Sequence, residues 1–322
     1  MTNTYSQVRG RPDLPAGLVA STLADRYGIA GSLRPLPSER DQNFLVTTTD
    51  GSAYVAKVAN VHERRCVLDL QLLAMRRLTA AGVGCPTVVE TGDGAHVLDV
   101  GGHLFRVLTY LPGRLLADRV DRTPALLWHL GEFLANLVRG LAGFSHPAAE
   151  RHLQWDVRHA ADVIGEYLPD VRADCRDLVQ ETRRMFVDRV APVLPELPQS
   201  VTHNDANDHN LVLDGDRVAG IIDFGDMVRS VTVNELAVGC AYAALEQPEP
   251  AAAVARVVGG YESVLPLGDQ ERALVPGLVR VRLATSVAVS AHQQALAPHD
   301  AYLSVSEAPA WEALARLDEG SR

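Results

Sequence analysis

Alternating apolar and polar residues near the N-terminus predict a sheet-rich region. Five runs show this pattern: GSLRPLPS (31–38), NFLVTTT (43–49), AYVAKVA (53–59), HVLDV (96–100) and HLFRVLTYL (103–111). The second and third runs are joined by Asp50-Gly51, and Asp-Gly between alternating apolar runs is a strong hairpin signal. Two helical patterns accompany the strands, at 18–27, ending at Gly28, and at about 62–81, ending before Gly82.

The pattern changes after Leu111-Pro112-Gly113, because long stretches with helical spacing dominate the rest of the chain. They span about 123–142, 156–168, 170–190, 232–246, 249–263, 270–296 and 307–318. We expect one strand pair among them, NLVL (210–213) and VAGIID (218–223). The sequence therefore predicts an α+β, two-lobed plan with a small antiparallel-sheet lobe (1–108), a hinge (109–114) and a larger, mainly helical lobe (115–322). Such plans usually place the active site in a cleft between lobes.

Composition and charge narrow the class of protein. Hydrophobic residues make up 47% and charged residues 22% of the 322 positions, which are ordinary globular values. The formal net charge of −10 argues against nucleic acid or an anionic membrane as the main partner. The four cysteines are scattered without a CxxC pair, which favours reduced thiols and a cytoplasmic location. We find neither a signal peptide nor a long uncharged apolar stretch, so we expect no membrane partner.

Only one of the 30 basic residues is a lysine, Lys57. Lysine is a compact point charge and arginine a wide planar fork, so the two are not interchangeable at a geometrically demanding site. The midpoint of Asn43 and Lys57 falls at the Asp50-Gly51 turn, which predicts that these two residues lie opposite each other. A surface lysine on an edge strand is the alternative interpretation.

The densest polar cluster lies at residues 201–226, VTHNDANDHNLVLDGDRVAGIIDFGD. The midpoint of Asn210 and Asp223 lies beside the DGDR turn, so antiparallel pairing brings them to the same end of a hairpin, roughly opposite each other. An amide oxygen beside a carboxylate suits a hard divalent cation such as Mg²⁺. Asp205 is predicted in the loop above the same end. Taken singly, these residues could also be turn and capping residues.

The spacing of the cluster carries more information than its composition. His203-Asn204-Asp205, then Asn210, then Asp223-Phe224-Gly225 follow the order H-x-D-x-x-x-x-N and D-F-G of protein-kinase catalytic and metal loops. The chain thus resembles the aminoglycoside phosphotransferase/choline kinase family, which has a protein-kinase-like fold. Its usual His-Gly-Asp reads His203-Asn204-Asp205 here. The segments HNDANDHN, ERDQNF, IIDFGDM, RLATSVAVSAHQQ and YLSVSEAPAW most resemble the hydroxylysine-kinase-like branch.

The resemblance implies a role for each matching position in the helical lobe. Asp205 would be the catalytic aspartate that accepts or orients the proton of the substrate hydroxyl. Asn210 and Asp223 would hold Mg²⁺ on the phosphates of the donor, ATP or GTP. His203 would stabilise the catalytic loop rather than transfer protons. Asp208 and Asp226 could meet a substrate ammonium or hydrogen-bond the loop, and both roles stay open.

In the sheet lobe, the resemblance implies that Lys57 contacts the α/β-phosphates. The segment 38–44 would replace a glycine-rich loop although it contains no glycine, with Ser38, Arg40, Asn43 or backbone amides contacting phosphate. The hinge near 108–111, which includes Tyr110, would bind the base through backbone groups. Kinases position the lysine with a carboxylate from the following helix. Asp69 is preferred over Glu63, although Asp69 could instead pair with an arginine of its own helix.

The implied function is a small-molecule kinase acting on a hydroxyl acceptor that carries an amine. The branch favours 5-hydroxylysine, with homoserine, choline, ethanolamine or an aminoglycoside as alternatives. A nucleotide-binding pseudokinase module is the alternative of another class, and a metallohydrolase lacks a second histidine at ligand spacing. Side chains that could recognise the acceptor are Trp155, Asp156, Tyr242 and Arg282. The sequence indicates no oligomeric state.

Overall fold

The structure of the protein is a computed structural model that describes residues 11–38, 40–119, 121–296 and 307–319. The chain divides into two compact units, Met1–Pro112 and Gly113–Arg322. This division falls within the segment 109–114 that the sequence suggests as a hinge, and the hinge itself stays a prediction. Glu39 and much of YLSVSEAPAW lie outside the described residues.

The N-terminal unit is built on one antiparallel sheet, as the alternating pattern predicts. Its strands are β1 (Gly31–Leu36), β2 (Gln42–Thr48), β3 (Ala53–Val58), β4 (Val88–Val89), β5 (Leu98–Val100) and β6 (His103–Thr109). They are ordered β1-β2-β3-β6-β4, with β5 also pairing with β6. The short β4 was not predicted, because two residues are too few to show an alternating pattern.

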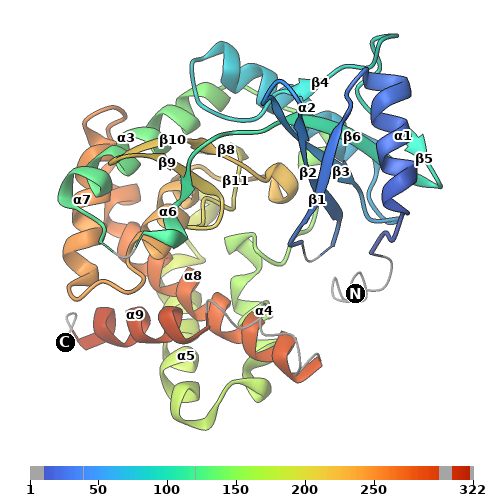
Figure 1. The fold of residues 1–322 in the computed structure, drawn as a ribbon. Helices are drawn as coiled ribbons and strands as arrows, with labels where there is room; N and C mark the ends of the chain where they lie inside the picture. Colours follow the sequence, from blue (N-terminus) through green and yellow to red (C-terminus); the bar gives the residue numbers. More distant parts are fainter. Residues whose placement is uncertain (1–10, 39, 120, 297–306, 320–322) are drawn as a thin grey trace. The chain divides into compact units, whose positions relative to one another are not determined.

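Helix α1 (Ala16–Tyr27) packs on one face of this sheet (Figure 1). Val19 and Leu23 of the helix share a buried cluster with Phe44 of β2 and Phe105 of β6. Alternate side chains of a strand point to opposite faces, so the polar residues between these apolar ones face away from α1. The helix ends at Gly28, whose φ of 66° is the left-handed conformation that closes many helices. The second helix, α2, spans Arg65–Ala80.

The C-terminal unit is mainly helical. Its described helices are α3 (Pro124–Leu141), α4 (Ala160–Tyr167), α5 (Ala173–Met185), α6 (Val233–Ala243), α7 (Pro250–Glu262), α8 (Asp269–Leu296) and α9 (Glu307–Glu319). Every residue of α6 is buried, as expected of a helix that is apolar on nearly all sides. The predicted helices are therefore confirmed, although a 3₁₀ turn (157–159) precedes α4 and a π-helical turn (186–190) follows α5.

The expectation of a single strand pair in this unit was wrong. Besides β9 (Leu211–Asp214) and β10 (Arg217–Ile221), it contains β7 (Arg114–Leu115), β8 (Gln199–Thr202) and β11 (Val228–Val231). β7 pairs with β9, and β8 pairs with β11 in a separate two-stranded ladder. A pairing between four-residue strands almost 30 positions apart leaves no local turn signal, so the periodicity of the chain could not show it.

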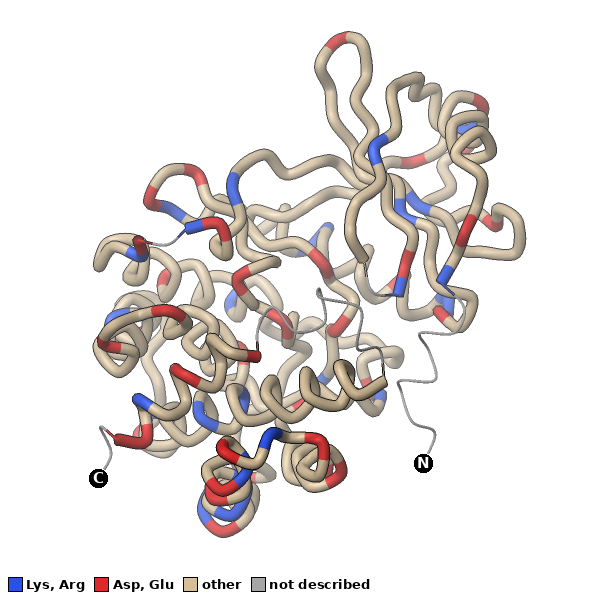
Figure 2. The backbone as a smooth tube through the Cα atoms, turned by 60° about the horizontal axis from the view of Figure 1, so that its bottom comes forward, with Lys and Arg blue, Asp and Glu red and all other residues tan. Residues whose placement is uncertain are grey.

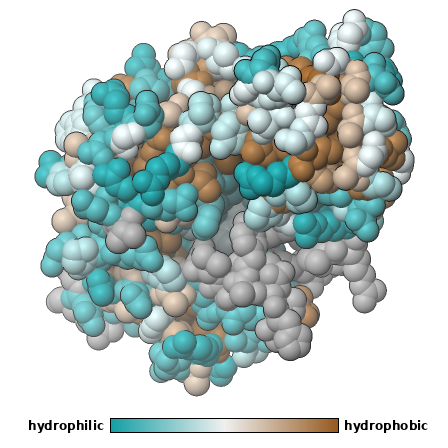
Figure 3. All heavy atoms as spheres, viewed as in Figure 1, coloured by the Kyte–Doolittle hydropathy of each residue, from teal (hydrophilic) through white to brown (hydrophobic). Residues whose placement is uncertain are grey.

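Charge and hydropathy are distributed without a single dominant feature. Figure 2 shows basic and acidic positions interspersed along the described backbone of both units. Apolar atoms reach the viewed surface among polar ones in Figure 3. The large exposed apolar side chains of the described residues are Leu18, Val61, Leu73, Tyr110, Val187 and Leu296. Helix α8 is long and apolar enough to cross a membrane, but 72% of its most apolar window is buried inside the protein, as in many core helices.

Candidate active site

The strand pair that the sequence did not reveal, β8 and β11, anchors both loops of the polar cluster. β8 leads directly into His203-Asn204-Asp205, and β11 follows Asp223-Phe224-Gly225. Thr202 lies opposite Val228 in the ladder, and the Thr202 hydroxyl donates to the Val228 carbonyl at 3.1 Å. The first loop therefore begins, and the second loop ends, at the same pair of hydrogen-bonded strands.

Arg151 also holds the second loop, because it binds backbone carbonyls within and just after Asp223-Phe224-Gly225. Its guanidinium donates to the carbonyl of Gly225 at 2.6 Å and to that of Met227 at 2.7 Å. An arginine fork satisfies two neighbouring carbonyls that no strand pairs. No local sequence pattern indicates this role, because Arg151 lies more than 70 positions before its partners.

The Asp205 carboxylate lies at the centre of a hydrogen-bond network. Its Oδ1 accepts from Asn207 Nδ2 at 3.0 Å and from Arg282 Nη2 at 3.1 Å. Its Oδ2 accepts from Asn210 Nδ2 at 2.7 Å. These three donors fix the direction of the carboxylate. The Asp205 side chain is 19% exposed, so part of it still reaches the surface.

The surroundings of Asp205 hold its proton more tightly than water does. Burial, together with the negative charges of Asp226 and Asp223, raises the pKa of Asp205 to about 7, and Arg282 acts in the opposite direction. A carboxylate with a pKa near neutrality suits a group that takes a proton from a hydroxyl and later releases it. The structure thus places the predicted catalytic aspartate in an environment suited to proton transfer.

His203 is fully buried and holds the loop in place, as the sequence suggests. Its Nε2 donates to the Ile222 carbonyl at 3.1 Å, and its Nδ1 accepts from the Asp205 amide at 3.3 Å. The ring also meets Phe224 edge-on, with centroids 4.7 Å apart. Desolvation lowers the pKa of His203 to about 4, so the imidazole is neutral and bridges the two loops.

Asn204 stands where the family pattern has glycine, and its backbone explains the exchange. Its φ is 67°, in the left-handed region that glycine adopts freely and asparagine tolerates best among the other residues. The asparagine side chain also adds a contact, because its Oδ1 accepts from Asn234 Nδ2 at 3.2 Å. The backbone amide at this position, which glycine would supply as well, donates to the Glu235 carboxylate at 3.1 Å.

The register of the β9–β10 hairpin refines one prediction. Asn210 and Asp223 lie at the same end of the hairpin, as expected, but not directly opposite each other. The pairing of Asp214 with Arg217 places the turn one residue earlier than the midpoint of Asn210 and Asp223, and a bulge between Val218 and Gly220 makes up only half of the difference. The Ile222 amide therefore donates to the Asn210 carbonyl at 2.9 Å, and Asp223 is the next residue along. Asp223 has a φ of 57°, a strained conformation for a non-glycine residue that often marks a functional position.

The donor set at this end of the hairpin fits a hard divalent cation. Asn210 Nδ2 is used by Asp205, so its Oδ1 is the atom left for a cation, and Asp223 adds an exposed carboxylate. Among the described residues, no group of three or more His, Cys, Asp or Glu side chains forms a complete cation site. Two ligands from the chain leave room for phosphate oxygens and water, as Mg²⁺ usually requires.

The structure separates the two open roles of Asp208. Its side chain is buried against Arg122, with Nη2 3.4 Å from Oδ2, and the Asp208 carbonyl accepts from the Ala117 amide at 2.9 Å. Asp208 therefore anchors its loop to the segment before α3. Asp226 is partly exposed, and its negative charge raises the pKa of Asp205, so Asp226 lies near the Asp205 carboxylate.

In the N-terminal unit, Lys57 lies in the predicted pairing but not on an edge strand. Asn43, Lys57 and Arg106 are directly opposite one another on β2, β3 and β6, so they share one face of the sheet. Lys57 is 8% exposed, which excludes the interpretation as a surface lysine. Arg106 donates to buried Gln71 of α2 at 2.6 Å, so this face is the one turned to α2.

The loop between β1 and β2 is shaped by side chains instead of glycine. Ser38 Oγ accepts from the Asp41 amide at 3.2 Å, and Asp41 Oδ1 accepts from the Asn60 amide at 3.0 Å. Asn60 in turn donates to the Arg40 carbonyl at 3.2 Å. The phosphate-binding role of this loop stays a prediction.

Two predicted site residues of the N-terminal unit remain, Tyr110 near the hinge and Asp69 of α2. The Tyr110 amide donates to the Ala53 carbonyl at 3.1 Å, so a base-binding contact there would use another backbone group. The two arginines considered as partners of Asp69 within α2 have other contacts: Arg65 donates to the Val97 carbonyl at 3.2 Å and Arg76 to Glu90 at 2.8 Å. The pairing of Asp69 with Lys57 stays a prediction.

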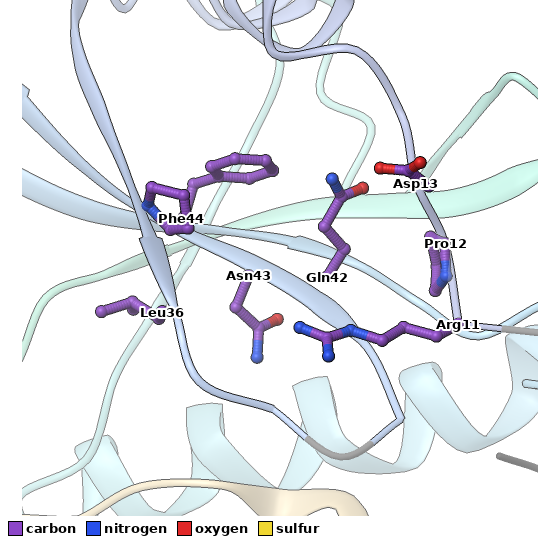
Figure 4. A pocket seen from close by; sticks show the side chains of 8 residues that line it. Arg11, Pro12, Asp13, Leu36, Gln42, Asn43 and Phe44 are labelled. Atoms are coloured by element: carbon purple, nitrogen blue, oxygen red, sulfur yellow. The ribbon is translucent and has the colours of Figure 1, made fainter. Parts of the chain in front are cut away.

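A cavity of about 280 Å³ opens beside Asn43 (Figure 4). Its lining residues are Arg11, Pro12, Asp13, Pro35, Leu36, Gln42, Asn43 and Phe44. Figure 4 shows the side chains of Arg11 and Asn43 extending toward each other across it. Gln42, another residue that lines the cavity, exchanges two hydrogen bonds with the Leu14 backbone, at 2.9 and 3.1 Å.

Comparison with known proteins identifies relatives over nearly the whole chain. Residues 32–274 match the sequence pattern of the phosphotransferase enzyme family. Hydroxylysine kinase of Danio rerio is 31% identical over 98% of this chain and 94% of the relative. Homoserine kinase of Methylobacillus flagellatus is 29% identical over 80% of this chain and 76% of the relative.

Solved structures agree with these matches at the level of the fold. A microcompartment-associated aminopropanol kinase has a TM-score of 0.72 at 19% identity, covering 94% of this chain and 95% of that one. Amicoumacin kinase, in complex with AMP-PNP and Ca²⁺, has a TM-score of 0.71 at 16% identity, covering 95% and 94%. The expected protein-kinase-like, α+β fold is therefore confirmed.

The left-handed backbone at Asn204 predicts different costs for two small substitutions. Asn204→Gly and Asn204→Ala both remove the contact to Asn234, but only alanine is strained at this φ. We expect Asn204→Ala to be about 1 kcal/mol less stable than Asn204→Gly. Urea unfolding of both variants measures the difference. Equal free energies of unfolding would show that the backbone at this position relaxes.

The neutral state of His203 predicts a pH-dependent contribution to stability. Its pKa is lowered from 6.5 to about 4 on folding, so the unfolded chain binds the proton more tightly and stability is lost as the pH falls from 6.5 toward 4. From pH 7 to pH 5, this loss is about 2 kcal/mol. Glu235 acts in the opposite direction, because burial raises its pKa to about 7.

These opposing groups make the wild-type protein alone a poor reporter, so a variant isolates the histidine. We expect the stability advantage of the wild type over His203→Gln to shrink by about 2 kcal/mol between pH 7 and pH 5. Urea unfolding at both pH values measures it. A constant difference would mean that His203 is not held neutral.

Proposed function

Because the chain belongs to the phosphotransferase enzyme family, we propose that it transfers the γ-phosphoryl group of ATP or GTP to a hydroxyl of an amino acid or amino alcohol. The observation that carries the proposal is the link between Asp205 and Asn210. One amide side chain donates through Nδ2 to the catalytic carboxylate and keeps its Oδ1 for a cation. Proton acceptance and charge neutralisation are thereby joined in one rigid unit.

In the proposed reaction, the acceptor oxygen forms a bond to the γ-phosphorus while the bond from that phosphorus to the β-phosphate oxygen breaks. Asp205 accepts the hydroxyl proton, and the nucleoside diphosphate leaves. Asn210 and Asp223 would hold Mg²⁺, which would supply positive charge to the phosphate oxygens. Lys57 contacts the α/β-phosphates, with Asp69 as the favoured carboxylate partner. Ser38, Arg40 and Asn43 contribute further phosphate contacts.

The acceptor proposed is 5-hydroxylysine, supported by the similarity to hydroxylysine kinases over nearly the whole chain. Homoserine is the second candidate, supported by a shorter match to homoserine kinases. Both carry an ammonium group, and Asp226 is a partly exposed carboxylate beside Asp205 that can meet it. A cytoplasmic location accords with four free cysteine thiols.

Replacing the proton acceptor tests the reaction. We expect Asp205→Asn to lose about 10²–10⁴-fold in turnover while nucleotide affinity stays the same, because a general base acts on the chemical step. Nucleoside diphosphate release is measured with 5-hydroxylysine, homoserine, ethanolamine, choline and an aminoglycoside, and nucleotide binding by calorimetry. The exposed Asp188→Asn is the matched control.

Two results would contradict the proposal in different ways. Near wild-type turnover in Asp205→Asn removes Asp205 from the mechanism. Nucleotide binding without release stimulated by any acceptor favours a pseudokinase module instead.

Replacing the single lysine tests its contact with phosphate. Lys57 is buried in a row with Asn43 and Arg106, where the wider guanidinium of Lys57→Arg does not fit in the same direction. We expect kcat/KM for the nucleotide to fall about tenfold or more. Arg34→Lys on the exposed face of β1 is the control. Unchanged kinetics would make the lone lysine an accident of composition.

A further inference from the structure

Arg282 is an arginine of α8 that reaches into the catalytic loop. It is only 5% exposed, and its Nη2 donates to Asp205 Oδ1 at 3.1 Å. Its guanidinium carbon lies 4.6 Å from the ring centre of Trp155 and 5.4 Å from that of Tyr242. Nη1 also approaches the Trp155 carbonyl at 3.4 Å. Two aromatic rings and a carbonyl thus fix the plane of the guanidinium before any substrate binds.

We propose that Arg282 is a positioning residue for phosphoryl transfer, which fixes the Asp205 carboxylate so that one lone pair of Oδ2 faces the acceptor hydroxyl. The inference rests on the proposed function, in which Asp205 receives the hydroxyl proton. A carboxylate offers about four acceptor positions. Arg282 and Asn207 occupy the two on Oδ1, and Asn210 occupies one on Oδ2. The single remaining position is therefore defined by the other three.

The electrostatic setting explains why a cation is placed here. The negative charges of Asp226 and Asp223 act on Asp205, and the charge of Arg282 opposes them. The same arginine also acts on buried Glu235. Without this cation, the repulsion between the Asp205 carboxylate and these neighbours would be unopposed, and only Asn207 and Asn210 would hold its direction. An error of about 1 Å in the position of a reacting group can cost about 10²-fold in rate.

Stability alone is a weak reason for this arrangement. Buried ion pairs often contribute little to folding, and apolar replacements of similar volume are frequently neutral. Arg280, two residues earlier on the same helix, already joins α8 to α9 through Asp318 at 2.5 Å. The contact of Arg282 with Asp205 is thus better explained by catalysis than by attachment of the helix.

The structure also offers a direct chemical test, because a small cavity borders the guanidinium. Its lining includes Gln154, Trp155, Asn234, Arg282 and Thr285. Truncation in Arg282→Ala enlarges this space next to the two rings. Free guanidinium ion matches the lost group in shape and charge, whereas urea matches it in shape alone.

The experiment measures steady-state kinetics of Arg282→Ala with 5-hydroxylysine and the nucleotide. We expect kcat to fall about 10²-fold, with KM for both substrates changed less than about threefold. Guanidinium at tens of millimolar is expected to restore turnover about tenfold or more, and urea at the same concentration is expected to have no effect. Arg280→Ala is the matched control, and guanidinium should leave its turnover unchanged.

Three results would overturn the inference. They are wild-type turnover in Arg282→Ala, loss of turnover that urea restores as well as guanidinium does, and loss that neither restores. Arg282→Met retains the packing of the stem on the rings, so it gives the same kinetic comparison if the alanine variant does not fold. Failure of the proposed function is distinguishable, because it leaves Asp205→Asn active, whereas failure of this inference alone leaves Asp205→Asn inactive.

Discussion

The site depends on one physical constraint: a carboxylate that is largely withdrawn from water must be supplied with hydrogen-bond donors. Asp205 obtains three, from Asn207, Asn210 and Arg282. Each donor restricts the direction of the carboxylate, so satisfying the buried charge also aims it. The buried polar groups around the site hold these donors in place.

The support extends outward from the carboxylate in layers of buried polar groups. His203 bridges the two loops as a neutral ring, and Glu235 of the fully buried α6 receives the Asn204 amide. β8 and β11 fix the loop ends, and Arg151 holds the carbonyls that the strands leave unpaired. Such networks are costly when a member is missing, because an unsatisfied polar group is then left in a low-dielectric interior.

The N-terminal unit also buries charged side chains, but here they are cations. Lys57 and Arg106 are buried cations on neighbouring strands, aligned with Asn43. The pairing of Asn43 with Lys57 followed from the Asp50-Gly51 turn, because a tight hairpin fixes its own register. Arg106 could not be placed in that row from the sequence, since β6 follows β3 only after a helix and more than 40 residues.

The sequence by itself determined the elements with local causes: the helices with regular apolar spacing, the first hairpin, and the order of His203, Asp205, Asn210 and Asp223. Only the tertiary structure decided which distant groups meet. The turn between Asp214 and Arg217 lies one residue earlier than the midpoint of Asn210 and Asp223, and the bulge near Ala219 makes up only half of the difference, so Asp223 lies one place from the predicted register. The β8–β11 ladder, Arg151, and Arg282 on Asp205 join segments about 30 to 80 positions apart, and periodicity carries no information about such contacts. Asn204 needed both levels, since its type permits a left-handed backbone and only the fold requires one there.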